Sequence, residues 1–406
     1  MSALLLRDLA QVVTHGGDGE PLRGRSLAEA AVLERGYVLI GEDGAIAAVG
    51  AMRDLPALAR DVEELDGTGL SAIPGLVDCH THPAFAGDRV QEFSLRARDA
   101  TYEELLAAGG GILSTTRATR AAGADELQRI VERHRDAMLA HGTTTFEGKS
   151  GYGLDRETEL AQLDAVASAG GVPTWLGAHA VPPEQPDAEA YVDWALAEVL
   201  PAAARVAVAA DVFVERGTFG IETARRYLRA CAEAGLALRL HGDQLTEMGA
   251  VPLAVELGAR SVDHLESTGA EGVAALARSD VAAVLLPVAA LYLGRPMPPG
   301  RALVDAGAIV ALATDFNPGS AFCESLPVVA TLACTQLGLA PEEALGAMTV
   351  NAAHVLGLRD RGRLAPGLRG DVVLVDAADW RHFAYHLAGD VVHTVVRAGT
   401  VVASRA

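Results

Sequence analysis

Two histidines separated by one residue follow an apolar segment near the start of the chain. The apolar residues 73–77 lead to His80 and His82. In a strand, residues i and i+2 project to the same face, so the two imidazoles would converge on one point. Neutral imidazole is the commonest metal-ligating side chain in proteins. The pair predicts part of a metal site, provided that other strands deliver further ligands to the same place.

Strand-like segments alternate with helical patterns through the middle of the chain. The segments are residues 72–79, 143–147, 173–179, 209–214, 236–241, 261–265, 281–286 and 308–314. Eight strands alternating with helices predict a distorted (β/α)₈ barrel, an α/β fold whose active sites lie at the carboxyl ends of the strands. An open doubly wound sheet is less favoured, because no GxGxxG turn follows the first strand.

The predicted strand ends carry a concentration of ionisable residues. In chain order these are His80, His82, Lys149, His179, Glu215, His241, His264 and Asp315. Such side chains are rarely buried without a partner. We therefore predict one divalent metal ion held by His80, His82, His241 and Asp315, and this donor set leaves Zn²⁺ and Fe²⁺ both open. Lys149 is interpreted as an ion-pairing residue, with a carboxylated lysine bridging two metals as the alternative.

Three of these residues are candidates for catalysis. A metal ion with an open coordination position generates hydroxide from water near neutral pH. Asp315 is predicted to take the proton of that water, and either His264 or His179 to polarise a carbonyl or stabilise an oxyanion. Asp263 is a candidate for orienting His264.

The loops after the strands suggest contacts to an anionic small molecule. Arg89 follows His82 closely, and arginine binds carboxylates bidentately, so we predict a clamp for a substrate carboxylate. The alternative is a surface ion pair of Arg89 with Asp88 or Glu92. Tyr152 stands in a glycine-dense loop and is a predicted substrate contact, as is the segment 316–320.

Composition excludes several classes of partner. The 406 residues are half apolar and carry a formal net charge of −20. Nucleic acids and anionic membrane surfaces are therefore not expected to bind, since they require a basic face. Four cysteines without CxxC spacing, and no signal-peptide layout, predict a cytoplasmic protein. The apolar run 281–294 is too short to span a bilayer.

Both ends of the chain are rich in short strand patterns. Residues 37–40 and 45–49 flank a glycine-containing turn, and residues 371–375 and 391–396 are β-rich. Neither end has enough strands to be stable alone, so we predict one small β-sandwich from residues 1–70 and 361–406, around a barrel at 71–360. Predicted helix starts include a capping box at 101–104, the caps Asp155, Thr218 and Thr246, and Pro341.

With these residues in view, the chain resembles the amidohydrolase superfamily and, within it, the imidazolonepropionase family. The segments that carry the resemblance are 74–89 (PGLVDCHTHPAFAGDR), 109–120 (GGGILSTTRATR), 141–154 (HGTTTFEGKSGYGL), 176–184 (LGAHAVPPE), 241–244 (HGDQ), 263–266 (DHLE) and 313–320 (ATDFNPGS). His-x-His after an apolar strand is shared across the superfamily, whereas KSGYGL, GAHAVPPE and ATDFNPG together are specific to the imidazolonepropionases. The resemblance covers nearly the whole chain.

The resemblance implies hydrolysis of 4-imidazolone-5-propanoate to N-formimino-L-glutamate, a step of histidine degradation, by attack of a metal-bound hydroxide on the ring amide. It implies the same four metal ligands, Arg89 as the carboxylate clamp, His264 assisting the hydroxide and Asp315 protonating the leaving nitrogen. The substrate would be lined by Tyr152, His179, Gln244, Asn317, Gly319 and Ser320. Related enzymes are often homodimers, so a homodimer is expected.

The sequence also departs from that family's pattern. Gly148 and Gly242 stand where bulkier residues are expected, which predicts looser packing beside Lys149 and His241. The segment 288–299 is more apolar and shorter than usual and is expected to reshape one pocket wall. The competing functions are another amidohydrolase, such as a cyclic amidine deaminase, and a non-catalytic metal-binding barrel. A deaminase would need a glutamate shortly after His241, where this chain has Gln244.

Overall fold

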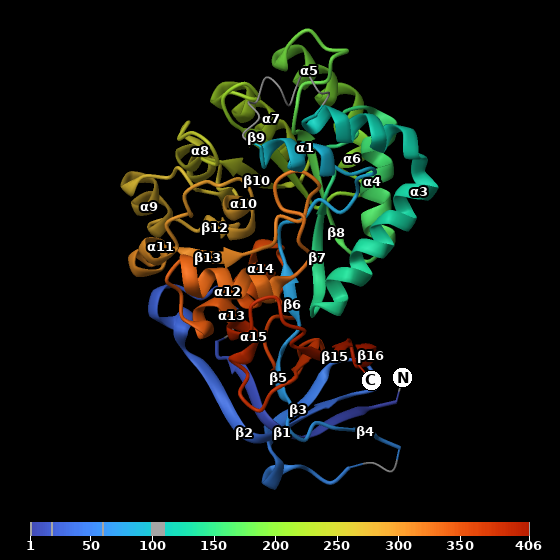
Figure 1. Cartoon of the computed structure of the whole chain (residues 1–406), viewed down its shortest axis with the longest axis vertical. Coiled ribbons are helices and arrows are strands. Elements are labelled where there is room, and N and C mark those ends of the chain that lie inside the picture. Colours follow the sequence, from blue (N-terminus) through green and yellow to red (C-terminus); the bar gives the residue numbers. More distant parts are fainter. Residues whose placement is uncertain (1, 18, 59–60, 99–109, 406) are drawn as a thin grey trace.

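The computed structural model describes residues 2–17, 19–58, 61–98 and 110–405. The capping box expected at 101–104 lies outside the described residues. The rest of the chain folds into a barrel and a separate sheet, which lie one above the other in Figure 1.

Eight parallel strands form the barrel in the order β13-β12-β11-β10-β9-β8-β7-β6. They are β6 (Leu76–Asp78), β7 (Thr143–Lys149), β8 (Val172–Ala178), β9 (Ala209–Val214), β10 (Ala237–Gly242), β11 (Ser261–His264), β12 (Ala282–Leu285) and β13 (Ile309–Leu312). The ring closes just beyond the ends of β6 and β13, where the Asp315 amide donates to the His80 carbonyl (3.0 Å) and the His82 amide donates to the Phe316 carbonyl (2.8 Å). This closure, which brings the first and last strand ends together, confirms the predicted barrel.

Helices cover the outside of the barrel (Figure 1). They are α1 (Val90–Arg96), α3 (Ile112–Ala140), α4 (Arg156–Ser168), α5 (Ala188–Trp194), α6 (Leu200–Ala203), α7 (Ile221–Glu233), α8 (Ala250–Leu257), α9 (Ala270–Ala277), α10 (Pro287–Tyr292), α11 (Gly300–Ala306), α12 (Leu326–Gln336), α13 (Pro341–Met348) and α14 (Val350–Val355). The largest apolar cluster joins strand and helix residues into one core.

Two of the predicted helix caps are wrong. Asp155 caps α4 and Pro341 opens α13 as expected, but α7 begins at Ile221 and α8 at Ala250. The hydroxyls of Thr218 and Thr246 hydrogen-bond to residues 213–215 instead, Thr246 to the Glu215 carboxylate. Tertiary partners thus take the donors that a capping pattern assigns to the local backbone.

The terminal segments form one sheet in the order β16-β15-β14-β5-β1-β2-β3, with β4 paired to β1. Its strands are β1 (Leu4–His15), β2 (Ala30–Ile40), β3 (Ile46–Ala51), β4 (Glu63–Asp66), β5 (Ser71–Pro74), β14 (Val372–Val375), β15 (Val392–Arg397) and β16 (Thr400–Ser404), with the short helix α15 (His382–Tyr385) between β14 and β15. Its apolar cluster draws on both ends of the chain, for example Leu6 and Val38 with Leu374 and Val396. Neither terminal segment has this core without the other, as the strand count predicted.

The apolar run expected as one strand at 72–79 is two strands that meet at Gly75. β5 pairs with β14 in the terminal sheet, and β6 pairs with β7 in the barrel. The Gly75 amide donates to the Asp371 carbonyl at 2.8 Å, and a Cβ on Gly75 would overlap the Thr144 hydroxyl. Only glycine leaves room for this crossing between the sheets. The boundary between the predicted domains therefore falls within a continuous backbone, and the division at residue 70 stays a prediction.

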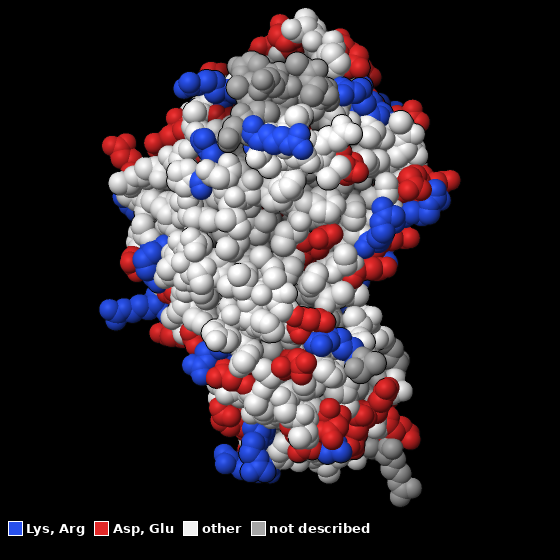
Figure 2. Space-filling model, viewed as in Figure 1, with Lys and Arg blue, Asp and Glu red and all other residues white. Residues whose placement is uncertain are grey.

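Figure 2 shows one face of the molecule, with acidic and basic side chains over the terminal sheet and along the barrel edges, and a broad area without charged side chains between them. No helix among the described residues is long and apolar enough to cross a membrane.

Candidate metal centre and substrate pocket

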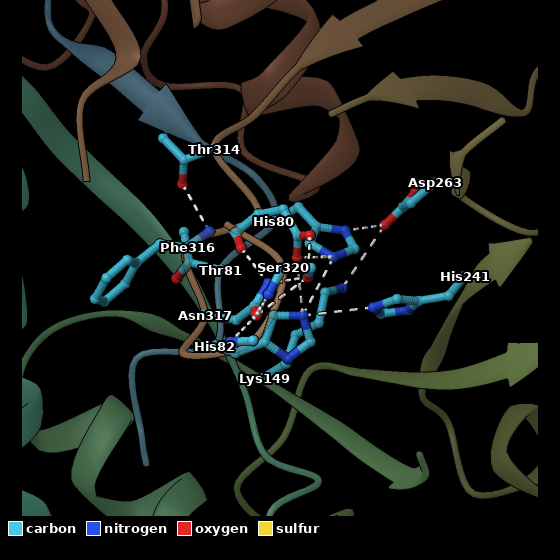
Figure 3. A network of polar contacts seen from close by, with 12 residues as sticks. His80, Thr81, His82, Lys149, His241, Asp263, Thr314, Phe316, Asn317 and Ser320 are labelled. Carbon is cyan, nitrogen blue, oxygen red and sulfur yellow. Dashed lines mark hydrogen bonds and ion pairs between the residues drawn. The ribbon is translucent and has the colours of Figure 1, made fainter. Parts of the chain in front are cut away.

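Three imidazoles and one carboxylate converge at the carboxyl end of the barrel. Figure 3 shows the rings of His80, His82 and His241 turned toward one another. The Nε2 atoms of His80 and His82 are 3.3 Å apart, and those of His82 and His241 are 3.4 Å apart. Asp315 Oδ1 lies 3.5 Å from His80 Nε2 and 3.4 Å from His82 Nε2. Ligand atoms about 2.1 Å from a tetrahedral zinc ion are about 3.4 Å apart, so these separations fit a metal ion.

Hydrogen bonds behind the imidazoles fix which nitrogens face inward as acceptors. His80 Nδ1 donates to Asp263 Oδ2 at 2.6 Å, and His241 Nδ1 donates to Asp211 Oδ1 at 3.0 Å. Because a carboxylate only accepts, each Nδ1 carries the proton and each Nε2 presents a lone pair. Burial lowers the pKa of His241 to about 3, so this ring is neutral. Lone pairs and a carboxylate that face one another in this way could hold a metal cation between them.

A buried charged network surrounds these ligands. Lys149 Nζ lies 2.7 Å from Asp211, 3.0 Å from Glu147 and 3.7 Å from Asp263, and Arg239 pairs with Glu147. This confirms the interpretation of Lys149 as an ion-pairing residue. The carboxylates of the network are those of Glu147, Asp211, Asp263 and Asp315. These four anions face only two cations within the network, and a divalent metal ion would neutralise the two remaining charges.

His264 lies beside the metal ligands, but Asp263 does not orient it. The Asp263 carboxylate faces His80, so that prediction is wrong. His264 and Leu265 have positive φ values of 83° and 71°, so the backbone leaves strand geometry at His264, while Asp263 stays on His80. His264 Nδ1 instead lies 3.5 Å from the buried Glu266 Oε1, and the ring packs near those of His80 and His241.

One cavity of about 240 Å³ reaches three of the candidate metal ligands and is lined by Arg89 and by the six residues that the resemblance places around the substrate. Its lining comprises His82, Arg89, Arg96, Gly111, Ile112, Tyr152, His179, Phe213, His241, Gln244, Leu245, His264, Leu293, Asp315, Asn317, Gly319 and Ser320. The segment 288–299, expected to shape one wall, contributes Leu293. Residues from seven strand ends and α1 thus meet in one place.

The glycine-dense loop that presents Tyr152 is held by a buried carboxylate. Glu159 accepts hydrogen bonds from the backbone amides of Gly151, Gly153 and Leu154 at 2.9–3.2 Å. Burial raises the pKa of the Tyr152 phenol, so it stays protonated and able to donate. The loop therefore aims a fixed hydrogen-bond donor into the cavity.

His179 is neutral and its tautomer is fixed. Its Nδ1 lies 2.9 Å from the Gly151 carbonyl, which can only accept, so Nδ1 carries the proton. Burial lowers the pKa of His179 to about 4. The remaining ring nitrogen, Nε2, is then a hydrogen-bond acceptor. This geometry suits His179 to a substrate N–H rather than to a developing oxyanion.

The segment after β13 forms a tight turn around Asp315. Asn317 Oδ1 accepts from the amides of Gly319 and Ser320 at 2.8 Å, and Asn317 Nδ2 donates to the Asp315 carbonyl at 2.6 Å. The Ser320 hydroxyl donates to Asp315 Oδ2 at 3.3 Å. Asn317 therefore shapes the turn, and Ser320 contacts the carboxylate oxygen that does not face the imidazoles.

The expectation of loose packing beside Lys149 and His241 is wrong. A Cβ on Gly148 would lie 2.5 Å from Val166 Cγ2, and one on Gly242 would overlap the Ala250 Cβ. The helices α4 and α8 fill the space that larger side chains would occupy. The two glycines permit close helix–strand packing.

Several residues that support the site were not predicted. Asp211 holds His241, Glu159 holds the Tyr152 loop, and Arg96 joins Arg89 and Glu92 in a charged cluster. The spacing of Arg89, Glu92 and Arg96 is i, i+3 and i+7, a helical pattern that could have revealed this cluster. The ion pair of Arg89 with Glu92, the alternative to a carboxylate clamp, is present, yet Arg89 also lines the cavity.

Comparison with known proteins agrees with this fold. The model of the amidohydrolase family matches residues 71–402, and the chain belongs to that family. The Rubrobacter xylanophilus imidazolonepropionase is 60% identical over 98% of both chains, and the Herpetosiphon aurantiacus imidazolonepropionase is 44% identical over 98% of this chain and 96% of its own. These similarities place the chain among the imidazolonepropionases of the family.

Solved structures share the fold at low identity. A triazine hydrolase variant matches with a TM-score of 0.74 at 19% identity, covering 100% of this chain and 95% of its own. An adenosine deaminase from Xanthomonas campestris with bound zinc matches with a TM-score of 0.72 at 19% identity, covering 98% and 92%. Both comparisons support the barrel with its attached sheet.

Proposed function

We propose that this chain hydrolyses the ring amide C–N bond of 4-imidazolone-5-propanoate, giving N-formimino-L-glutamate in histidine degradation. The observation that carries the proposal is the cavity lined both by three of the four candidate metal donors, His82, His241 and Asp315, and by Arg89. A substrate with a hydrolysable ring amide and a carboxylate needs these two features together. The curated relatives named imidazolonepropionase, at 60% and 44% identity, support the same reaction.

The metal ion in this proposal is divalent, Zn²⁺ or Fe²⁺, and the side chains that would hold it are His80, His82, His241 and Asp315. Their spacing, their tautomers and the two uncompensated negative charges of the network all favour it. When bound, such an ion activates water and polarises a carbonyl oxygen as a Lewis acid.

The protein side chains then have distinct roles. Arg89 binds the propionate carboxylate, and His179 Nε2 accepts a hydrogen bond from a ring N–H. His264 stabilises charge that develops on the carbonyl oxygen. Asp315 takes a proton from the attacking water and returns it to the ring nitrogen that leaves. Ser320 keeps the second carboxylate oxygen of Asp315 in place during this transfer.

A cyclic amidine deaminase, the competing amidohydrolase, is not favoured. Its carboxylate would have to come from the segment after His241. There Asp243 accepts from the Thr268 hydroxyl at 2.8 Å and from the Met248 amide at 3.4 Å, and does not line the cavity. Gln244 does line it, but an amide carries no proton between substrate and water. A non-catalytic barrel is equally disfavoured, because every side chain that the hydrolysis requires is present.

Two properties of the working enzyme complete the proposal. All four cysteines are free, which accords with a reducing cytoplasm. We also propose a homodimer, on the strength of the family resemblance. Light scattering of the purified protein would give the mass in solution.

An ultraviolet assay tests the reaction directly. Metal-analysed protein is mixed with freshly prepared 4-imidazolone-5-propanoate, the loss of ring absorbance is followed, and the product is identified by mass. We expect N-formimino-L-glutamate, with activity abolished by chelation and by His80→Ala. A protein that binds one metal ion per chain but leaves the ring intact would refute the proposed substrate.

A further inference from the structure

Three charged side chains of one helical face meet at the substrate cavity. Arg89 precedes α1, and Glu92 and Arg96 follow at helical spacing. The side chains of Arg89 and Glu92 are 12% and 7% exposed, and that of Arg96 is 22% exposed. Arg89 and Arg96 line the cavity, whereas Glu92 lies behind Arg89. The cluster therefore has one net positive charge.

Glu92 occupies one specific edge of the Arg89 guanidinium. Arg89 Nε donates to Glu92 Oε2 at 2.8 Å and Arg89 Nη2 donates to Glu92 Oε1 at 2.5 Å. A guanidinium has five N–H groups, and this bidentate pair uses two of them. The three that remain include the whole Nη1–Nη2 edge, which can bind a second carboxylate bidentately. Glu92 thus leaves Arg89 competent for an anionic ligand.

Further contacts hold this arrangement in one position. Glu92 Oε2 also accepts from the Gly111 amide at 2.8 Å, which ties it to the start of α3. Arg89 Nη1 lies against Gly319, where any Cβ would overlap it. Arg96 Nη2 donates to the Gly319 carbonyl at 2.6 Å, and its guanidinium lies over the Tyr292 ring, 5.6 Å from the centroid. The Gly319 turn and α1 are therefore fixed to each other on both sides of Arg89.

We infer that Glu92 is a positioning residue that determines selectivity for carboxylate substrates. Glu92 binds the Nε–Nη2 edge of the Arg89 guanidinium, which leaves the Nη1–Nη2 edge for the substrate carboxylate. Arg96 holds the Gly319 turn against the same guanidinium. This inference rests on the proposed function, since it assigns how the same site selects an acid over its neutral analogue. Arg89 then forms the ion pair with Glu92 and binds the substrate carboxylate at the same time, through different N–H groups.

The test is Glu92→Gln, assayed with 4-imidazolone-5-propanoate and with the corresponding propanamide. A glutamine presents an NH₂ group to one of the two Arg89 donors, so the bidentate pair is lost. For the carboxylate we expect KM to rise about tenfold or more with kcat within about threefold, which corresponds to losing about 1.4 kcal/mol of binding. For the propanamide we expect kcat/KM to change by less than about threefold.

The matched control is Glu256→Gln, which removes an arginine-paired carboxylate on the surface, where it accepts from Arg225 and Arg229. It should leave the ratio of the two substrates unchanged. If Glu92→Gln does not fold, Gly319→Ala displaces Arg89 from the other side. It should lower the ratio of kcat/KM for the propanoate to kcat/KM for the propanamide. An equal loss with both substrates, or an unchanged ratio, would overturn the inference. A wild-type protein inactive on both substrates would instead refute the proposed function.

Discussion

Replacing Asp263 by asparagine would test whether the carboxylate behind His80 sets the metal-binding tautomer. Asp263 Oδ2 accepts from His80 Nδ1 at 2.6 Å and lies 3.7 Å from Lys149 Nζ. An asparagine that turns its NH₂ toward His80 would favour the tautomer with the proton on Nε2, which cannot bind metal. The opposite orientation keeps the amide oxygen at the Oδ2 position, near both His80 and Lys149, but removes the negative charge. Only the aspartate combines that acceptor with a charge opposite the Lys149 ammonium.

The expected loss follows from the burial and length of this hydrogen bond. Removing such a partner of a metal-binding histidine typically lowers metal affinity 10- to 100-fold, which is about 1.4–2.8 kcal/mol. Both side chains are 0% exposed, so water cannot substitute for the carboxylate. We therefore expect the upper part of that range for Asp263→Asn.

The assay is a competition titration of the metal-free protein with Zn²⁺ and a chromophoric chelator, which reports affinity without turnover. Asp305→Asn is the matched control, since Asp305 pairs with Arg301 on the surface of α11. Circular dichroism would verify that both variants are folded. A dissociation constant for Asp263→Asn within about threefold of the wild-type value would refute the reasoning about the tautomer.

Three further predictions concern packing, loop position and pH. Gly148→Ala should lower the free energy of unfolding in urea by about 1–3 kcal/mol, because the new Cβ overlaps Val166. Val166→Ala in the same chain should relieve part of this loss, and strictly additive effects of the two substitutions would show that the side chains do not overlap. Glu159→Gln should lower kcat/KM about tenfold, because buried amides of the Tyr152 loop lose a carboxylate acceptor. Unchanged kinetics would show that the loop keeps its conformation without this carboxylate. Burial lowers the pKa of His15, so the unfolded chain binds more protons below about pH 6.5. Stability should therefore fall as pH drops below that value, and less steeply in His15→Gln, as measured by urea midpoints between pH 7 and pH 5; parallel profiles would exclude the effect.

Local patterns in the sequence were enough to predict the barrel. Strands buried on both faces read as short apolar runs, and a helix such as α4 begins at a capping aspartate. The convergence of His80, His82, His241 and Asp315 followed from the rule that strand ends share one face of a barrel. These predictions depended only on side-chain type and on spacing along the chain.

What the sequence could not reveal were choices among distant partners. The sequence predicted that Lys149 forms ion pairs but not that its partners are Asp211 and Asp263, because those contacts join three different strands. The positive φ of His264 is likewise set by tertiary packing and redirects a side chain that strand alternation would place elsewhere. Gly75 is a further example, because the apolar run 72–79 gives no sign that the chain crosses there from the terminal sheet into the barrel.

That passage at Gly75 also links the order of synthesis to the completion of the active site. The strand β5 ends at Pro74, six residues before His80, and pairs with β14, residues 372–375. On a ribosome, β5 emerges roughly 300 residues before its partner, a separation that raises the entropic cost of pairing only slowly with loop length. The strand β5 can pair with β1 as soon as it emerges, whereas its other edge stays unpaired until the chain is almost finished. A chain that ends before residue 372 would carry every candidate metal ligand, but the strand that leads to the first two would be paired on one edge only.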